Sequence, residues 1–251
     1  EAQEKLTPEI TFALNNAKTL VELEDIYLPF RPKRKTRASV AREKGLEPLA
    51  LEIIKQEKGF DPNKYAENFV DEEKEVPTAQ DAINGAMDII AEQLSDSAEI
   101  RKRLRDIFRK NASLKSVASD EEQDSVYTNY YDYCESVKKI AGHRVLAVNR
   151  GEKEGFLKVG IELDKELPLG IINRALDKGT NPLCSDILKA AGDDAYTRLI
   201  FPSIEREIRS ELTETADENA MKVFAVNLKQ LLMQPPVKGK TVLGLDPGYR
   251  T

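Results

Sequence analysis

The feature that most constrains the fold is a ladder of apolar residues near the C-terminal end of the chain. The ladder consists of Ile204, Ile208, Leu212, Ala216, Ala220, Phe224, Leu228 and Leu231. A helix has 3.6 residues per turn, so a spacing of four rotates the apolar stripe by about 40° at each step. We therefore predict one long helix from about Ser203 to Leu232, ending before Pro235. Because its stripe rotates, this helix should touch different neighbours along its length, as a strut between helical lobes does.

Capping residues predict shorter helices upstream. A threonine that accepts from free helix amides, helped by a proline or an acid nearby, marks several helix starts. Helices of this kind are expected after Thr7, Thr19, Thr36 and Thr78. Others are expected over 46–57, 97–110 and 182–192, and the two helices between 78 and 110 should form a hairpin.

One stretch has the two-residue period of a strand. Leu157, Val159, Ile161 and Leu163 alternate with polar or small residues, which predicts a half-buried strand. Its partner is either 144–149 or a strand elsewhere, because 144–149 could equally end a helix. Residues 113–124 are polar and acidic, and we interpret them as a mobile connection or a domain junction.

The fold class that follows is mainly α: an irregular multi-helical assembly with at most a small β element. The expected domains are a helical lobe with a basic loop at 1–118, a second helical region at 119–236 that holds the β element and the strut, and a final segment at 237–251. In that segment, residues 241–245 should form the first strand of a further domain. The chain begins Glu-Ala-Gln-Glu, and we expect it to be cut at both ends and not to be a complete enzyme.

Composition narrows the function classes. The 251 residues carry a net charge of -6, which argues against a protein that coats nucleic acid with its whole surface. No apolar run approaches the roughly eighteen residues that span a bilayer, so no membrane partner is expected. Cys134 and Cys184 are far apart, which indicates reduced thiols used for packing in the cytoplasm.

The most concentrated charge is a basic run over 31–44. It contains Arg31, Lys33, Arg34, Lys35, Arg37, Arg42 and Lys44, against the single acid Glu43. Such a run can meet several phosphates and release their counterions, the usual source of sequence-independent nucleic-acid affinity. It could equally be a solvated surface that pairs with acidic segments.

Two other basic groups differ in what they indicate. Arg101, Lys102, Arg105, Arg109 and Lys110 lie between the apolar positions of a predicted helix, which favours a solvated face. The second group consists of Lys138, Lys139, His143 and Arg144, and His143 is the one histidine of the chain. That histidine is either a hydrogen-bonded turn residue or a further phosphate contact.

Catalytic and metal-binding patterns are weak. One histidine and two separated cysteines cannot assemble a zinc site, and no Gly-x-Ser-x-Gly motif or phosphate-binding glycine loop occurs. Asp246, in GLDPG, follows an apolar segment in the way that nuclease carboxylates do, but one carboxylate does not make a two-metal site. Tyr127, Tyr130, Tyr131 and Tyr133 are better explained by core packing of a helix than by base stacking. We therefore expect no cofactor, no metal and no enzymatic activity.

Three stretches together resemble one family. They are YLPFRPKRKTRASVAREKGLEPLA at 27–50, FPSIEREIRSELTETADENAMKVFAVNLKQLL at 201–232 and VLGLDPGYRT at 242–251. They are similar to the Tex family of bacterial transcription accessory proteins, over essentially the whole chain and in the same order. The resemblance implies a cytoplasmic protein with a helical amino-terminal region, part of it helix-turn-helix-like. A YqgF-type RNase H-like domain, helix-hairpin-helix motifs and an OB-fold RNA-binding domain would follow, as would kinship with a eukaryotic elongation factor and histone chaperone.

Two departures qualify this resemblance. An upstream motif like VPFIARYRK is missing, and so are the modules after GLDPGYRT, including the OB-fold to which the main nucleic-acid affinity of the family is attributed. The YqgF-type domain is thought to lack nuclease activity, and only Asp246 matches a resolvase acid. The leading hypothesis is thus a non-catalytic scaffold with a weak, auxiliary contact to DNA or RNA phosphates. The alternative is a structural module that docks other domains or the transcription machinery without binding nucleic acid.

Overall fold

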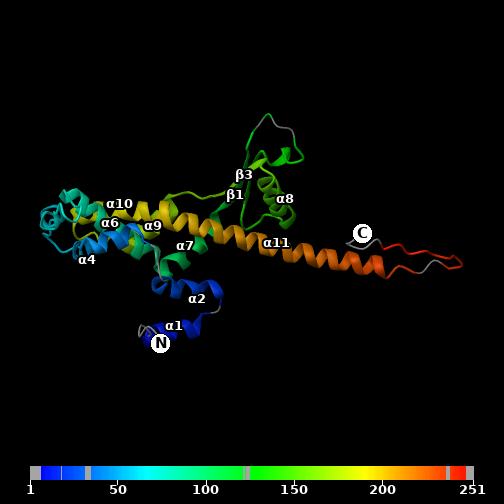
Figure 1. Ribbon diagram of the computed structural model, residues 1–251, viewed down its shortest axis with the longest axis horizontal. Helices are drawn as coiled ribbons and strands as arrows, with labels where there is room; N and C mark the ends of the chain where they lie inside the picture. The colour runs from blue at the N-terminus through cyan, green and yellow to red at the C-terminus, as the bar shows by residue number, and fades with distance from the viewer. Residues whose placement is uncertain are drawn as a thin grey trace.

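Helix α11 (Phe201–Leu232) runs along the long axis of the molecule (Figure 1). The computed structural model describes residues 7–17, 19–31, 35–120, 122, 125–235 and 238–246. Helix α10 (Pro182–Asp194) leads into α11 through a π-helical segment, Ala195–Ile200, so residues 182–232 are helical without a break. Pro202 lies two residues after the end of this segment. A proline inside a helix removes one backbone hydrogen bond and crowds the preceding turn, and a π-bulge before it relieves that crowding.

Short helices pack around the amino-terminal half of this long helical run. They are α3 (Arg37–Glu43), α4 (Glu47–Lys55), α5 (Pro62–Ala66) and α6 (Ala79–Ser95), with a 3-10 turn at Glu67–Phe69. Their shared core includes Ala41, Leu49, Ile53, Ala86, Ile89 and Leu188. At Gly85 the helices meet so closely that a Cβ would lie 2.3 Å from Leu46 Cδ1. A larger residue there would force the helices apart.

A second core lies where α7 (Ala98–Asn111) and α9 (Glu166–Leu176) meet the π-helical segment and the start of α11. It is built from Leu104, Phe108, Leu114, Ile172, Tyr196 and Ile204, all of them fully buried. The Phe201 ring contacts Phe108 and Tyr196, with centroids 5.7 and 5.8 Å apart. This aromatic group joins α7 to the long helix.

A three-stranded antiparallel sheet stands on one side of α11, in the order β2-β1-β3. The strands are β1 (Ser113–Ala118), β2 (Asp132–Ser136) and β3 (Leu157–Glu162), and a 3-10 turn at Thr128–Tyr130 precedes β2. Leu114 pairs with Glu135 on one side and Ile161 on the other. Helix α8 (Gly142–Lys153) connects β2 to β3 and packs on α11. The sheet is thereby anchored to the long helix.

Side chains of α11 also cover the outer edge of β3. Glu205 Oε1 accepts from the Ile161 amide at 2.9 Å, and Arg209 Nη1 donates to the Val159 carbonyl at 3.3 Å. Unpaired backbone groups at a sheet edge invite another strand to add. Here two side chains occupy them instead.

The first two helices lie on the opposite side of α11 from the sheet (Figure 1). They are α1 (Pro8–Asn16) and α2 (Leu20–Tyr27), and a 3-10 turn follows at Leu28–Phe30. Thr7 and Thr19 cap them as predicted, accepting from the Ile10 and Glu22 amides. No residue of α1 is buried, and Asp25 is the one buried residue of α2.

The mainly α architecture with a small β element is confirmed, as are the long helix and the strand over 157–162. The interpretation of 113–124 as a connection is wrong, because 113–118 form the central strand. The segment proposed as the partner of the strand over 157–162, residues 144–149, lies inside α8. The expected hairpin also fails, since α7 packs on α9, α11 and α2 more than on α6. The domain division at 118 and 236 stays a prediction, and the sheet is shared across its first boundary.

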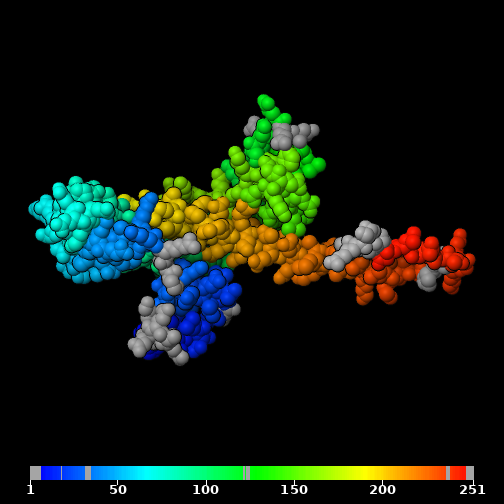
Figure 2. Space-filling model, viewed as in Figure 1, coloured from blue at the N-terminus to red at the C-terminus, as the bar shows by residue number. Residues whose placement is uncertain are grey.

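Beyond Ala216 the long helix leaves the body, and its apolar ladder faces solvent. Phe224 and Leu231 are 65% and 62% exposed, whereas Ile204 and Ile208 are buried. Figure 2 shows this end of the helix extending away from the rest of the molecule. The strand expected over 241–245 is not formed, because no strand pairs with it in the part of the chain that is described, and Val242, Leu243 and Leu245 are exposed there.

Candidate nucleic-acid interface

The basic run over 31–44 is divided by the structure. Arg31, Lys35 and Arg37 are exposed. Arg42 instead donates to Glu92 Oε2 at 2.6 Å, and Lys44 Nζ donates to the Glu75 carbonyl at 3.0 Å. Lys33 and Arg34 lie outside the described residues. Arg42 and Lys44 thus bind acids of the same chain, and three cations of the run are presented to solvent.

The helix start within this run is already capped. Thr36 and Ser39 form a reciprocal capping box, in which the Ser39 amide donates to Thr36 Oγ1 at 3.0 Å and the Thr36 amide to Ser39 Oγ at 2.9 Å. The Thr36 hydroxyl also donates to the buried carboxylate of Glu92 at 2.9 Å. The capping box satisfies the Thr36 and Ser39 amides, and the Glu92 carboxylate places a negative charge beside this helix start. A phosphate is therefore less favoured here than at an uncapped helix start.

The second basic group surrounds a helix start that has no such cap. Lys138 and Lys139 lie in the turn before α8, and His143 and Arg144 lie in its first turn; all four are exposed. Ala141 is the N-cap residue and provides no side-chain hydrogen bond, and the first turn contains no acid. The first amides of a helix have no intrahelical partner, and the helix dipole makes that end favourable for anions.

A small hollow lies beside this helix start. It has a volume of about 260 Å³ and is lined by Lys138, Gly142, Thr215 and Asn219, together with Glu211 from α11. Glu211 is bound by Arg109, which donates from Nε at 3.0 Å. At Gly142 the helix comes so close to α11 that a Cβ would lie 3.1 Å from Ala216 Cα. Glycine therefore sets how deeply the α8 start can lie against the long helix.

Arg144 is oriented by neighbours on β2. It donates from Nη1 to Glu135 Oε2 at 2.9 Å, and the Tyr133 hydroxyl donates to the same carboxylate oxygen. These bonds lower the pKa of Glu135, the one from Tyr133 most and the one from Arg144 next. Burial, followed by the bond to Glu135, raises the pKa of Tyr133 to about 12. Glu135 is therefore a carboxylate that neutralises Arg144, so Lys138 and Lys139 remain as the less engaged cations beside this helix start.

The two basic groups belong to different parts of the molecule. Helix α3 packs on α6 in the first core, whereas α8 packs on α11 and β3 (Figure 1). The structure therefore does not merge them into one site. They are two separate exposed patches.

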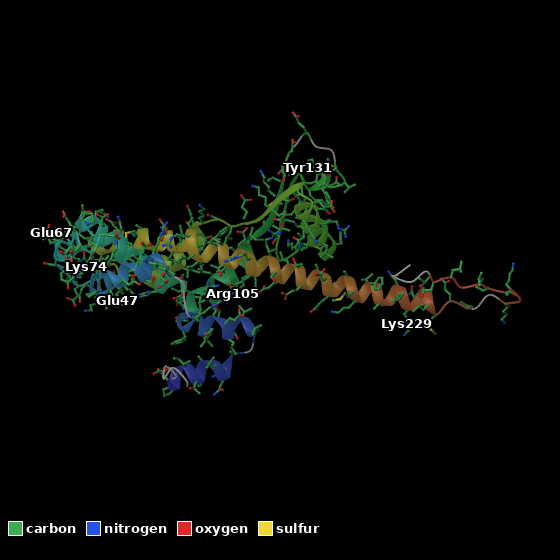
Figure 3. All side chains as sticks on the ribbon, in the orientation of Figure 1. Glu47, Glu67, Lys74, Arg105, Tyr131 and Lys229 are labelled. Atoms are coloured by element: carbon green, nitrogen blue, oxygen red, sulfur yellow. The ribbon has the colours of Figure 1, made fainter. Side chains whose placement is uncertain are left out.

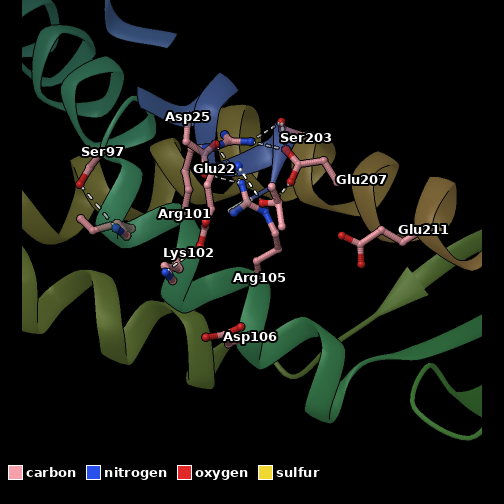
Figure 4. A network of polar contacts seen from close by, with 12 residues as sticks. Glu22, Asp25, Ser97, Arg101, Lys102, Arg105, Asp106, Ser203, Glu207 and Glu211 are labelled. Carbon is pink, nitrogen blue, oxygen red and sulfur yellow. Dashed lines mark hydrogen bonds and ion pairs between the residues drawn. The ribbon is translucent and has the colours of Figure 1, made fainter. Parts of the chain in front are cut away.

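Sequence reasoning missed a polar network that joins α2, α7 and α11. Figure 4 shows Asp25, Arg101, Arg105, Ser203 and Glu207 converging. Arg101 Nε donates to Asp25 Oδ1 at 2.9 Å, and Arg105 Nε donates to Glu207 Oε2 at 2.7 Å. Both arginines are buried, so the prediction of a solvated basic face is wrong for them. The sequence contains a signal for this network. Arg101, Arg105 and Arg109 are spaced by four residues on one helix, and their partners Ser203, Glu207 and Glu211 have the same spacing on another.

The other singled-out residues have structural surroundings. Cys184 is buried as predicted, whereas Cys134 is exposed. Tyr127 is buried and Tyr130 packs edge-on against Tyr133, with centroids 5.2 Å apart, but these tyrosines lie on turns and β2 and not on a helix. Among the described residues, no group of three His, Cys, Asp or Glu side chains could hold a metal ion. In the same part of the chain, no helix is long and apolar enough to cross a membrane.

Comparison with known proteins identifies relatives along the entire chain. The family described as "Tex central region-like" matches residues 57–224. An uncharacterised protein of Bacillus subtilis, YdcI, is 46% identical over 252 residues, which cover 99% of this chain and 35% of the relative. "Protein tex" of Bordetella pertussis is 36% identical over 264 residues, covering 99% of this chain and 33% of that protein.

A human relative matches as well. The "S1 RNA-binding domain-containing protein 1" of Homo sapiens is 30% identical over 261 residues, covering 98% of this chain and 26% of that protein. The chain spans about a third or less of the length of these curated relatives.

Proposed function

Because this chain belongs to the Tex family of transcription accessory proteins, we propose that it is a non-catalytic scaffold with an auxiliary, sequence-independent contact to the phosphate backbone of DNA or RNA. The observation that carries the proposal is the uncapped start of α8, surrounded by Lys138, Lys139, His143 and Arg144. We propose that this part of the protein acts in the cytoplasm. Its partners would be nucleic-acid phosphates and, through other surfaces, the transcription machinery.

Physical chemistry favours phosphate at the α8 start. Free amides and the helix dipole attract an anion there, and cations on the preceding turn add a Coulombic attraction. Contacts with phosphate oxygens carry no base information, so binding should not depend on sequence. The chain as a whole has a net charge of -6, so binding of phosphate should be confined to a local basic patch.

The exposed part of the basic run supports the same function from a second direction. Arg31, Lys35 and Arg37 flank the start of α3, and the turn of Lys44, Gly45 and Leu46 links α3 to α4. Gly45 has φ +83°, a left-handed conformation that suits glycine and turns the chain sharply. This helix-turn-helix-like arrangement would present the three cations as a second, weaker phosphate contact.

A binding titration tests the proposal. The chain is titrated against single- and double-stranded DNA and RNA of unrelated sequences, each at 50 and 200 mM salt. We expect weak binding to all four that falls steeply at the higher salt and shows no sequence preference. Absence of binding even at 50 mM salt would contradict a nucleic-acid contact.

A cleavage assay tests the non-catalytic part of the proposal. Labelled DNA and RNA are incubated with the chain and Mg²⁺ or Mn²⁺, and both should remain intact. Cleavage that persists through purification and is lost in Asp246→Asn would contradict this expectation.

A second candidate function is a protein-interaction module without nucleic-acid binding. The distal half of α11 favours it, because Met221, Phe224, Leu228 and Leu231 are all at least 40% exposed and form an apolar stripe. Exposed apolar patches of this kind mark interaction surfaces. If the titration shows no salt-dependent binding, this function takes first place.

A further inference from the structure

Helices α1 and α2 form an acidic arm against a basic helix. Within their bounds they carry Glu9, Glu22, Glu24 and Asp25 and no basic residue. They lie beside α7, whose sequence holds six arginines and lysines. The acidic arm therefore covers part of a helix with the charge of a phosphate-binding surface.

The arm is attached mainly by charge. Asp25 is buried, but Leu20, Leu23 and Tyr27 of α2 are 71%, 43% and 51% exposed, and α1 has no buried residue. The apolar burial that normally fixes a helix to its neighbour is thus small here. Beside Asp25, Lys102 Nζ donates to Glu22 Oε1 at 2.8 Å.

Asp25 is held in the way that a phosphate would be. Arg105 Nη2 donates to both of its carboxylate oxygens, at 2.9 and 2.7 Å, and Arg101 Nε adds a third bond at 2.9 Å. These are charge-assisted hydrogen bonds, which guanidinium groups donate to phosphates as well as to carboxylates. The Ser203 hydroxyl, which accepts from Arg101 Nη2 at 2.9 Å, lies on the α11 side of the network.

The charge balance shows what removal of the arm would leave. With Asp25 in place, two buried arginines face Asp25 and Glu207, so the group is neutral. Without the arm, Glu207 is the acid that remains paired with Arg101 and Arg105 among the described residues, and Lys102 loses Glu22. The exposed surface would carry an excess of positive charge suited to an anion.

We propose that Arg101 and Arg105 form a phosphate-binding site in which Asp25 is a built-in competitor, so that a phosphate-bearing ligand releases the α1–α2 arm. The site is separate from the start of α8 and does not depend on the function proposed above. The phosphate can belong to a free anion or to a nucleic-acid backbone.

Hydrogen exchange of residues 20–27 in the intact chain measures the arm. Asp25→Asn should speed exchange there by about tenfold or more, because it removes the charge that holds the arm, while exchange in α4 and α6 stays unchanged. Asp106→Asn is the matched control, since Asp106 lies on α7 and its carboxylate pairs with Arg109 of the same helix. Unchanged protection in Asp25→Asn would overturn the proposal.

Ligand specificity is tested in the wild-type chain at constant ionic strength. Replacing chloride by inorganic phosphate should speed exchange of residues 20–27 severalfold, and Arg105→Lys should abolish this response because one ammonium group cannot replace the separate Nε and Nη2 donors of the guanidinium. A DNA duplex, added in a parallel sample, distinguishes the sources. Release by inorganic phosphate alone assigns the site to free phosphate, and release by DNA, with or without release by inorganic phosphate, assigns it to the nucleic-acid backbone. Equal exchange in chloride, phosphate and DNA would overturn the phosphate site.

Discussion

Asp25 on α2 accepts two hydrogen bonds from Arg105 on α7, although the two residues are 80 positions apart in the chain. Arg105 also donates from Nε to Glu207 on α11 at 2.7 Å. One guanidinium group therefore joins three helices. A buried ion pair is expensive to break, because removing one partner leaves an uncompensated charge.

Arg105→Ala should therefore destabilise the chain by about 3–5 kcal/mol, measured by urea unfolding. Arg103→Ala on the same helix is the control, because the Arg103 side chain is 61% exposed and pairs with Glu99, one turn away on the same helix. The control should cost no more than about 0.5 kcal/mol. Equal losses in the two variants would show that the network contributes no special stability.

The helix that carries this network could be predicted from sequence, but the burial of its arginines could not. Apolar spacing at Ile100, Leu104 and Ile107 defined the stripe, and the intervening arginines were assigned to water. Their partners Asp25 and Glu207 lie 76 and 106 residues away from Arg101. The residue pattern within one helix cannot show that a charged residue from another helix will pair with its arginines and cover them.

The central strand was missed for a related reason. In β1, Leu114 and Ser116 are both buried. Burial of the polar Ser116 side chain is tolerated because its hydroxyl donates to the Tyr130 carbonyl at 2.6 Å. A serine on the buried face breaks the apolar alternation by which strands are recognised. The neighbouring strand over 157–162 keeps that alternation and was predicted correctly.

For the candidate site, the cations could be identified from the sequence, but not which of them pair with acids and which remain exposed. Arg42 and Lys44 carry the same charge as Lys138 and Lys139. In the described part of the chain, Arg42 is bound by Glu92 and Lys44 by Glu75, whereas Lys138 and Lys139 are exposed. The missing cap at Ala141 was equally hidden, because the helix start itself was not predicted. Tertiary contacts decide which member of a basic run remains available.

Tyr196→Phe should leave stability unchanged or raise it by about 1 kcal/mol at pH 8, because the buried Tyr196 hydroxyl has no hydrogen-bond partner among the described residues. Tyr133→Phe removes a bond to Glu135 and should cost about 1–2 kcal/mol. Urea unfolding of both variants at pH 8 compares them. Destabilisation by Tyr196→Phe equal to that of Tyr133→Phe would indicate that Tyr196 has a partner.

The same tyrosine predicts a pH dependence. Burial raises the pKa of Tyr196 to about 12, whereas an unfolded tyrosine titrates near 10. Between these values the native state holds a proton that the unfolded state has lost, so stability falls as the pH rises from about 10 to about 12. Unfolding at pH 8 and 11 should show a smaller alkaline loss in Tyr196→Phe than in wild type. An equal loss would place the titration elsewhere.

Two glycines should respond in opposite directions to alanine. Gly142→Ala would place a Cβ 3.1 Å from the Ala216 Cα, a backbone atom that cannot rotate away, and should cost about 1–3 kcal/mol. Gly170→Ala, inside α9, meets no atom within 4 Å and should stabilise by about 0.5–1 kcal/mol. Thermal unfolding of the two variants measures both effects. A tolerated Gly142→Ala would mean that α8 can move away from α11.

The salt dependence of DNA binding in a double variant tests the proposed phosphate contact most directly. Lys138→Ala with Lys139→Ala removes two exposed cations before α8, and Lys74→Ala with Lys229→Ala is the control, because those lysines lie far from α8 along the molecule (Figure 3). Each lost phosphate contact should reduce the slope of log affinity against log salt by about 0.9, so the first variant should lose up to about two units and the control none. An unchanged slope in the first variant would contradict a phosphate contact at the start of α8.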